Sequence, residues 1–512
     1  MHRNERLDYL SRLDTVDLAV IGGGATGLGV ALDAALRGLS VVLFESHDFA
    51  GGTSSRSTKL LHGGVRYLAQ GHLPLVFEAL AERATAMHNA SHLAQPLGFV
   101  MPSYHWWQTP FYGAGLKLYD AMARRAGLGP TRWLGRERAL ALLPGVQPKG
   151  LLGGVEYWDG QFDDARLAIA LARSAEVAGA KVMNYMEVLD RHWADGHSTL
   201  RARDRIEGRE ITVRARCVVN ATGVWVDALR PPSGRPRPLV QPSQGVHLVV
   251  DREFLAGDHA LLVPKTEDGR VLFAVPWLGK LILGTTDTPR QDIPREPLPQ
   301  AQEIDFILRE ASRVLSRPVR REDIRSQWVG LRPLVAADPG QRTGALSREH
   351  TIVVEDGLVT VTGGKWTTYR PMAEDALNQA MEAGLLPQRL GGLTERHRLM
   401  ACPTDGEPGV PLHAPPGWHL LGTDAASVRQ TQGAEHQIGM GLNAAMVRHF
   451  VRAEYALTVE DVLARRWRAL FLDAQQAATM APEVADLLRQ EGVAQPRLDD
   501  FLALCRIYAA QA

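Results

Sequence analysis

At 512 residues the chain is longer than a single hydrophobic core usually organises, so we expect two or three domains. Lys and Arg together number 57, as do Asp and Glu, so nucleic-acid binding has no electrostatic support, whereas an anionic small molecule needs only a local cluster. The three cysteines, Cys217, Cys402 and Cys505, lie far apart, which argues against a structural metal site, an iron–sulfur cluster and a disulfide framework.

The N-terminal elements predict a βαβ unit. Short apolar runs at 16–21 and 40–44 are typical of buried strands, and 26–37 is expected to be the helix between them. Parallel strands need a crossover connection of this kind, so the unit indicates a parallel sheet.

A glycine-rich turn joins the first strand to the helix. Glycine there permits a tight turn, close approach of a pyrophosphate and close helix–strand packing, and the helix N-terminus favours the negative charge. Glu45, after the second strand, can accept hydrogen bonds from the adenosine ribose and argues against a 2′-phosphate. The predicted cofactor residues of this unit are Gly22, Gly24, Ala25, Thr26, Gly27 and Glu45.

A second polar segment, 53–67, begins eight residues after Glu45 and reads TSSRSTKLLHGGVRY. Its hydroxyls and glycine backbone suit a phosphate-bearing cofactor, and the cation beyond them suits an anionic substrate. One segment could therefore touch both cofactor and substrate. Arg56, inside it, could contact a phosphate or point to solvent.

The middle of the chain alternates helices with β-rich runs. Further helices are expected at 75–89, 116–125, 163–178, 300–316 and from about 371, and strands at 181–185, 217–221, 239–250, 260–264, 271–276, 280–284, 351–354 and 358–361. The short runs between 239 and 290, separated by Gly, Asp and Pro, predict an antiparallel sheet. Region 186–219 suggests strand hairpins.

Composition changes near residue 400. The segment 402–418 is rich in proline and glycine and is interpreted as part of a linker at 376–417, followed by a helical domain at 418–512. Within it, Thr458 and Asp461 have the spacing of a capping box. The apolar residues that then fall on one helical face are Val459, Val462, Leu463, Trp467 and Leu470.

Three features favour FAD over NAD. The glycine fingerprint lies at the start of a long chain, and Ala221-Thr222-Gly223 closes a later strand that could return to the cofactor. A second glycine turn at 362–369 precedes a helix, whose N-terminus could stabilise negative charge on a reduced flavin.

With these motifs in place, the chain resembles the FAD-dependent, quinone-linked aerobic glycerol-3-phosphate dehydrogenase family. The matching segments, in family order, are 21–27, 53–67, 163–167, 219–226, 284–287, 330–333 and 363–370, and 454–473 resembles the family's helical cap. The 59–67 segment is far more specific than the glycine fingerprint.

The resemblance implies an α/β fold: a glutathione-reductase-like, Rossmann-type FAD-binding domain interleaved with an antiparallel β substrate domain, plus a C-terminal helical cap. The oxidoreductase domain would span 15–375, with FAD-binding parts at about 15–100, 160–230 and 330–375 and a substrate-binding part at about 235–330.

The implied reaction is oxidation of sn-glycerol 3-phosphate to dihydroxyacetone phosphate, with hydride passing from C2 to flavin N5 and electrons then to a quinone. The alternatives are an oxidase that uses O₂ and makes hydrogen peroxide, an amine or hydroxy-acid oxidoreductase on the same scaffold, and a flavin sensor without turnover.

The resemblance implies roles for the matched residues. Further cofactor contacts are assigned to Thr53, Ser54, Ser57, Lys59, Leu60, His62, Gly63, Ala221, Gly223, Gly363, Gly364, Lys365 and Thr367. The catalytic and substrate candidates are His247, Arg332, Lys365, Arg66 and Tyr67. His247 has the best intrinsic pKa for a base, but the choice among His247, Arg332 and Lys365 stays open.

Each role has an ordinary alternative. His247 could be a satisfied core histidine, Arg332 an ion-paired surface residue and Lys59 a solvated lysine. Asp287 either hydrogen-bonds near the substrate or ends a turn.

No signal peptide and no apolar run long enough for a membrane span is visible, and a cytoplasmic location is expected. Because the family acts on membranes, we predict peripheral contact with the inner face of the cell membrane; a homodimer is also compatible with the family. The predicted membrane contact comprises Trp106, Trp107, Phe111, Tyr112, Lys117, Arg124 and Arg125. An aromatic cluster packed between domains is the alternative.

A second basic group, Arg465, Arg466 and Arg468, is expected to be a solvated helix face.

Overall fold

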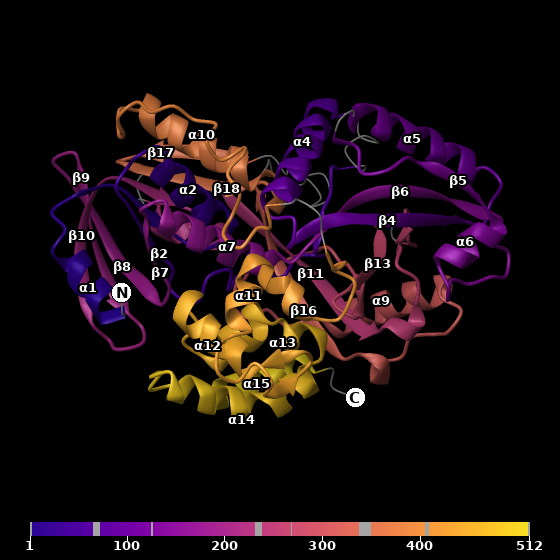
Figure 1. Ribbon diagram of the computed structural model, residues 1–512. Helices are drawn as coiled ribbons and strands as arrows, with labels where there is room; N and C mark the ends of the chain where they lie inside the picture. The colour runs from indigo at the N-terminus through magenta and orange to yellow at the C-terminus, as the bar shows by residue number, and fades with distance from the viewer. Residues whose placement is uncertain are drawn as a thin grey trace.

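The computed structural model describes residues 3–64, 72–123, 126–230, 238–267, 269–336, 350–404 and 409–509. Arg66, Tyr67, Arg124 and Arg125 therefore lie outside the described residues. Two large sheets lie beside each other, and a group of C-terminal helices packs below them in the view of Figure 1.

The first sheet is the predicted parallel sheet. Its order is β17-β18-β10-β1-β2-β7. The pairs β18–β10, β10–β1 and β1–β2 are parallel, whereas β17 is antiparallel to β18. The bounds are β1 Val16–Ile21, β2 Val41–Phe44, β7 Lys181–Met183, β8 Met186–Ala194, β9 His197–Asp204, β10 Glu210–Asn220, β17 His350–Glu355 and β18 Leu358–Gly363. The predicted hairpins of 186–219 are β8, β9 and β10.

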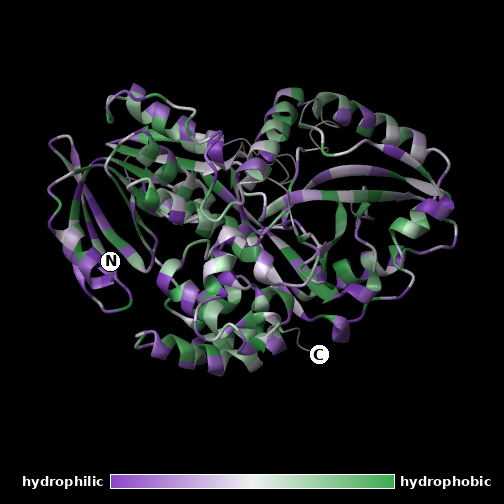
Figure 2. Cartoon of the chain, viewed as in Figure 1, coloured by the Kyte–Doolittle hydropathy of each residue, from purple (hydrophilic) through white to green (hydrophobic). Residues whose placement is uncertain are grey.

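Three helices cover one side of this sheet. Helix α2 (Ala25–Leu36) packs against both α7 (Asp164–Val177) and α10 (Tyr369–Glu382). The helices approach closely because Gly29 has no side chain: a Cβ there would lie 3.0 Å from the Tyr369 ring. Apolar residues of β1 and these helices share one buried core, and Figure 2 shows hydrophobic residues along the strands and helices in this region.

The second sheet is mainly antiparallel and has the order β15-β11-β14-β13-β12-β4-β6-β3, with β16 paired to β11 and β5 paired to β6. The bounds are β3 Leu60–Leu61, β4 Ala94–Ser103, β5 Arg132–Gly135, β6 Gly153–Phe162, β11 Val240–Asp251, β12 Ala260–Val263, β13 Leu272–Trp277, β14 Lys280–Gly284, β15 Thr288–Pro289 and β16 Ser326–Val335. Helix α9 (Ala301–Val314) packs on β11, β13 and β14.

The second sheet draws on more of the chain than the predicted antiparallel part at about 235–330. Strands β3 to β6 come from residues 60–162, so the expected FAD-binding part at 15–100 ends within the second sheet. The parallel pair β4–β12, which aligns Phe99 with Ala260, makes this connection. Such long-range pairing leaves no local sequence pattern, and the prediction from composition could not find it.

The remaining helices border the sheets or form the C-terminal group. They are α1 Arg3–Ser11, α4 Leu73–Asn89, α5 Gln108–Ala123, α6 Arg136–Leu142, α8 Val226–Leu229, α11 Ala425–Val428, α12 Ala444–Ala453, α13 Ala469–Leu472, α14 Ala474–Gln490 and α15 Leu498–Tyr508. The predicted linker begins inside α10, because this helix continues to Glu382.

The predicted capping box in the C-terminal group is confirmed. The Asp461 amide donates to Thr458 Oγ1 at 3.1 Å, and the Thr458 amide donates to Asp461 Oδ2 at 3.0 Å. The turn that follows is a π-helix, Asp461–Arg466, rather than the expected α-helix. The five apolar residues predicted for one face are all buried: Val459, Val462, Leu463, Trp467 and Leu470.

The prediction of a solvated basic face at Arg465, Arg466 and Arg468 is wrong, because all three side chains are buried. Arg465 and Arg466 pair with Asp48, which lies more than 400 residues earlier in the first domain. Arg468 donates to Ser55 O at 2.8 Å and lies 3.2 Å from Asp164. These cations therefore join the C-terminal helices to the part of the chain around the first sheet.

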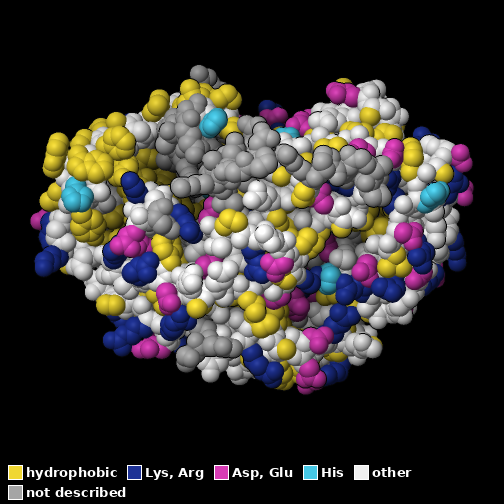
Figure 3. Space-filling view, turned by 180° about the vertical axis from the view of Figure 1, so that it is seen from behind, with side chains coloured by type: hydrophobic (Ala, Val, Ile, Leu, Met, Phe, Trp, Pro, Cys, Tyr) yellow, Lys and Arg dark blue, Asp and Glu magenta, His cyan; other side chains and the backbone are white. Residues whose placement is uncertain are grey.

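Three of the four aromatic residues before and at the start of α5 are exposed, so the alternative of a cluster packed between domains is wrong for them, whereas Tyr112 is half-buried against a hydrophobic core. Trp106 is 81% exposed, Phe111 67% and Trp107 44%. Hydrophobic side chains gather on this part of the surface, at the upper left of Figure 3. Among the described residues, we find no helix with the length and apolar character of a membrane span.

Candidate functional site: a dinucleotide pocket beside a His–Arg pair

A pocket of about 500 Å³ opens at the point where the connections between the strands of the first sheet change direction. The chain leaves β1 and returns through α2 to β2 on one side, whereas β10 flanks β1 on the other. Ligands of open α/β sheets bind at such a switch point, beyond the carboxyl ends of the strands.

The glycine turn at β1 is required sterically. Gly22 has φ +112°, and a Cβ there would lie 2.5 Å from the Ala221 carbonyl oxygen. A Cβ on Gly27 would lie 1.9 Å from the Gly22 carbonyl oxygen. Helix α2 begins at Ala25 with no side-chain cap at Gly24, which leaves its N-terminus suited to an anion.

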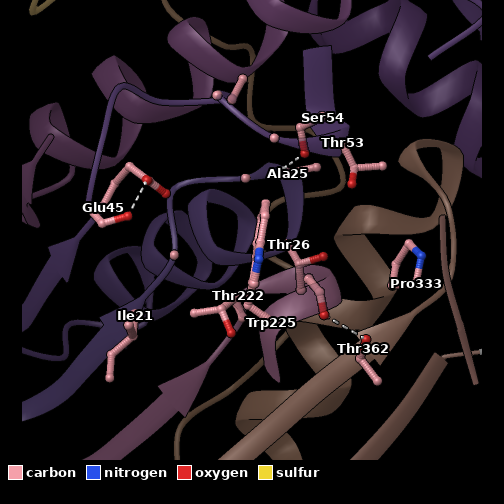
Figure 4. Close-up of a pocket in the computed structure, with 18 of the residues that line it drawn as sticks. Ile21, Ala25, Thr26, Glu45, Thr53, Ser54, Thr222, Trp225, Pro333 and Thr362 are labelled. Atoms are coloured by element: carbon pink, nitrogen blue, oxygen red, sulfur yellow. Dashed lines mark hydrogen bonds between the residues drawn. The ribbon is translucent and has the colours of Figure 1, made fainter. Parts of the chain in front are cut away.

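Glu45 is held at one side of the pocket. Its carboxylate accepts hydrogen bonds from the amides of Gly23 at 2.7 Å and His47 at 2.8 Å. Burial raises the pKa of Glu45, and the bond from Gly23 opposes this effect. Figure 4 shows Glu45 and Pro333 on opposite sides of the pocket, with Thr53 and Ser54 between them.

Distant segments complete the wall. The Ala25 amide donates to Ser54 Oγ at 3.0 Å, and the Trp366 indole donates to Ser54 O at 2.9 Å. The Thr53 hydroxyl donates to Leu331 O at 2.6 Å, so this segment also ties the pocket to the second sheet. The predicted cofactor residues that line the pocket are Gly22, Gly24, Ala25, Thr26, Glu45, Thr53, Ser54, Ala221, Gly223, Gly363, Gly364 and Lys365.

Other predicted cofactor residues lie outside this lining: Gly27, Ser57, Lys59, Leu60, His62, Gly63 and Thr367. Gly27 serves the helix–strand packing that was expected of it. Thr367 donates to the His62 carbonyl oxygen at 3.5 Å, which brings the two predicted segments together. The Leu60 side chain is buried in the hydrophobic core.

Ser57 and Lys59 share a buried carboxylate. Asp164 Oδ2 accepts from Ser57 Oγ at 2.7 Å and from Lys59 Nζ at 2.8 Å. Desolvation lowers the pKa of Lys59 to about 7, against the opposing charge of Asp164. The solvated alternative for Lys59 is therefore wrong, and its side chain anchors the segment 53–64 instead of lining the pocket.

His247 lies on β11 and is buried. Its Nε2 is 2.8 Å from Thr58 Oγ1, and among the described residues its Nδ1 has no hydrogen-bond partner. Burial, and then the positive charges of Arg332 and Lys59, hold the pKa of His247 well below its ordinary value. The ring is therefore neutral at pH 7 and can accept a proton.

Arg332 lies on β16, which pairs with β11 along its whole length. Its guanidinium donates to Thr286 O at 3.1 Å, Asp287 Oδ1 at 3.2 Å and Thr285 Oγ1 at 3.2 Å. Asp287 thus orients Arg332, so the Asp287 carboxylate does more than end a turn. A Cβ on Gly245 would lie 2.3 Å from Arg332 Nη2, so glycine makes room for the guanidinium.

Arg56 neither lines the pocket nor points to solvent. Its buried guanidinium pairs with Glu296 at 2.6 Å and donates to Arg295 O at 3.0 Å. A Cβ on Gly330 would lie 2.7 Å from the Arg56 carbonyl oxygen, so the glycine of the 330–333 motif permits this close approach. The pocket residues that the sequence did not single out include Ser46, His47 and Arg295, since none belongs to a short motif, whereas Trp225 lies in the matched segment 219–226 but had no predicted role.

Comparison with known proteins agrees with this architecture. The family of FAD dependent oxidoreductases matches residues 17–370, and the C-terminal domain of alpha-glycerophosphate oxidase matches residues 418–493. The glycine cradle, the open N-terminus of α2 and Glu45 fit the pyrophosphate and ribose of FAD. Fold and pocket therefore define an FAD-dependent oxidoreductase.

Individual relatives identify a more specific family within this class of oxidoreductases. Mitochondrial glycerol-3-phosphate dehydrogenase of Rattus norvegicus is 39% identical over 96% of this chain and 72% of its own length. The mitochondrial enzyme of Arabidopsis thaliana is 38% identical over 93% of this chain and 83% of its own. The solved structure of the Bacillus halodurans glycerol-3-phosphate dehydrogenase, complexed with FAD, has a TM-score of 0.78 at 28% identity, covering 99% of this chain and 97% of that one. The chain belongs to the FAD-dependent glycerol-3-phosphate dehydrogenase family.

Proposed function

We propose that the chain oxidises sn-glycerol 3-phosphate to dihydroxyacetone phosphate and passes the electrons to a quinone. The observation that carries this proposal is the placement of neutral His247 and cationic Arg332 on paired strands. Pro333, the residue after Arg332, lines the dinucleotide pocket on the side away from Glu45. A base and an anion-binding group would thus face the flavin end of the cofactor.

Each side chain has a distinct role in the proposed oxidation. His247 takes the proton of the substrate C2 hydroxyl, because its imidazole is neutral and its Nδ1 has no partner among the described residues. Arg332, oriented by Asp287, binds the phosphate or stabilises the developing alkoxide. Bound FAD would supply the hydride acceptor. Lys365, in the pocket wall, would contact the flavin or the substrate. Arg66 and Tyr67 remain predicted substrate contacts.

Anaerobic bleaching of the bound flavin tests substrate and cofactor together. We expect glycerol 3-phosphate to bleach the flavin, and glycerol and sarcosine to fail at the same concentration. Bleaching by sarcosine but not by glycerol 3-phosphate would reject the proposal in favour of an amine oxidoreductase. A flavin that stays oxidised with every substrate would indicate a sensor.

The electron acceptor needs its own test. We propose a quinone at a membrane surface, on the inner face of the cell membrane, because Trp106, Trp107 and Phe111 form an exposed aromatic surface and Lys117 is exposed further along α5. Quinone-analogue reduction should then exceed hydrogen peroxide production under air. Dominant peroxide production would identify an oxidase, the alternative suggested by the C-terminal family match. A homodimer is a further proposal, which sedimentation of the holoenzyme would test.

A further inference from the structure

One cation in the dinucleotide pocket belongs to none of the sequence motifs. Arg295 lies on the segment between β15 and α9, in the part of the chain that builds the second sheet. It nevertheless lines the same pocket as Glu45, Gly51 and Ser54 of the first domain. The second sheet therefore contributes a charged side chain to a site otherwise formed mainly by the βαβ unit.

The segment that carries Arg295 is fixed from two sides. The Trp225 indole donates to Ile293 O at 3.0 Å, and Trp225 itself lines the pocket. Arg56 donates to Arg295 O at 3.0 Å and pairs with Glu296 at 2.6 Å. These contacts hold the backbone before and after Arg295, so the guanidinium is directed to one region of the pocket.

That region is the glycine stretch that leads to Thr53. A Cβ on Gly51 would lie 3.3 Å from Arg295 Nη2, so the guanidinium passes over Gly51 at near-contact distance. Residues 51–54 all line the pocket, and the Ser54 hydroxyl is hydrogen-bonded to the first amide of α2. Arg295 and the N-terminus of α2 thus approach the same stretch from different domains.

In the part of the chain that the structure describes, the charge of Arg295 has no direct partner. Among the described residues, its guanidinium forms no hydrogen bond and no ion pair within 4.0 Å. Glu460, the carboxylate that affects it most, is paired with Arg465 at 2.5 Å. Burial lowers the pKa of Arg295, yet arginine remains charged in proteins. A largely desolvated cation without a partner needs an anion in the bound state.

A dinucleotide pyrophosphate supplies that anion. It carries two negative charges, whereas the N-terminus of a helix such as α2 offers only about half a positive charge. Arginine matches phosphate oxygens with two parallel donors. We propose that Arg295 donates charge-assisted hydrogen bonds to the pyrophosphate of FAD and so clamps the cofactor from the second-sheet side.

The test measures cofactor binding rather than turnover. Purified holoenzyme is diluted, and FAD release is followed by the rise in flavin fluorescence to give the dissociation constant. Arg295→Gln should weaken FAD binding about tenfold or more, because a hydrogen bond to a charged group is lost. Arg295→Lys, which keeps the charge, should lie between Arg295→Gln and the unchanged protein. The matched control is Arg321→Gln, an exposed arginine paired with Asp305, which should leave FAD affinity unchanged.

The salt dependence of FAD affinity distinguishes a phosphate contact from a packing effect. The affinity of the unchanged protein for FAD should fall as salt is raised, and this dependence should be weaker in Arg295→Gln. An FAD affinity within twofold of the unchanged protein would overturn the inference. So would a loss of affinity with an unaltered salt dependence, since Arg295 would then act only through packing.

Discussion

His247 stacks on Trp328, with ring centroids 5.2 Å apart and the planes inclined by 15°. Lys59 places Nζ 5.1 Å from the centroid of the same indole. The aromatic ring therefore lies against both the proposed base and a buried cation. Because the imidazole is confined by Trp328 and Thr58, its proton-accepting nitrogen keeps one orientation.

His247→Gln should lower kcat/KM by about 10²–10⁴-fold while leaving FAD bound, because the general base is removed. The pH profile of the unchanged enzyme should show its acid limb below the ordinary histidine pKa of about 6.5, since the environment depresses the pKa of His247 and only the neutral form accepts a proton. Steady-state kinetics across pH measures both effects. Wild-type kcat/KM in the variant would exclude His247 as the base.

Arg332→Ala should cost about 3 kcal/mol or more in kcat/KM, because a charged contact to the substrate is lost. The same change removes a charge that lowers the pKa of His247, so the acid limb should move to higher pH. The exposed residue Arg317, changed to Ala, is the matched control. Near-normal kinetics in Arg332→Ala would remove Arg332 from the site.

Local patterns predicted much of this fold. The apolar run at Val16–Ile21 and the glycines after it specify strand and turn within a few residues, because burial on both faces and a tight turn leave a direct compositional mark. The segments 53–64 and 362–369 were likewise identified as neighbours of the cofactor, and Thr53 and Lys365 do line the pocket.

What the sequence could not predict depends on partners far along the chain. Arg465 and Arg466 look like a solvated basic group until Asp48 is placed against them. Arg295 belongs to no motif, and only the fold brings it to Gly51. Lys59 is similar: its Nζ meets Asp164, more than 100 residues away. In each case the contacting residue is close in the fold but far away along the chain.

Asp48→Asn should destabilise the protein by about 3–5 kcal/mol, because it leaves two buried arginines without their shared carboxylate. Denaturant unfolding of the holoenzyme measures this loss. Asp486→Asn breaks an exposed ion pair with Arg489 and should change stability by less than about 1 kcal/mol. Equal stabilities of the two variants would show that the Asp48 cluster does not hold the domains together.

His449 predicts a pH dependence of stability at the same interface. It lies 3.4 Å from Asp424 and 3.5 Å from Glu454. Burial alone would lower the pKa of His449, but these carboxylates outweigh it and raise the pKa. The stabilisation is therefore complete below the unfolded pKa of about 6.5 and is lost as the pH rises through the higher folded value. Thermal unfolding should show this decline, and His449→Gln should flatten it; an identical slope in the variant would contradict the assignment.

The exposed aromatic surface gives the last prediction. Trp106 and Phe111 project from the start of α5, where indole and phenyl rings can enter the interfacial region of a bilayer. Changing both to Ala should reduce co-sedimentation with anionic lipid vesicles several-fold, since each ring contributes buried apolar area. Turnover with a water-soluble quinone analogue should be unaffected, because neither residue lines the dinucleotide pocket. Leu390→Ala, at another strongly exposed apolar residue, controls for general loss of surface hydrophobicity and should bind vesicles normally. Undiminished vesicle binding by the double variant would place the membrane contact elsewhere on the chain.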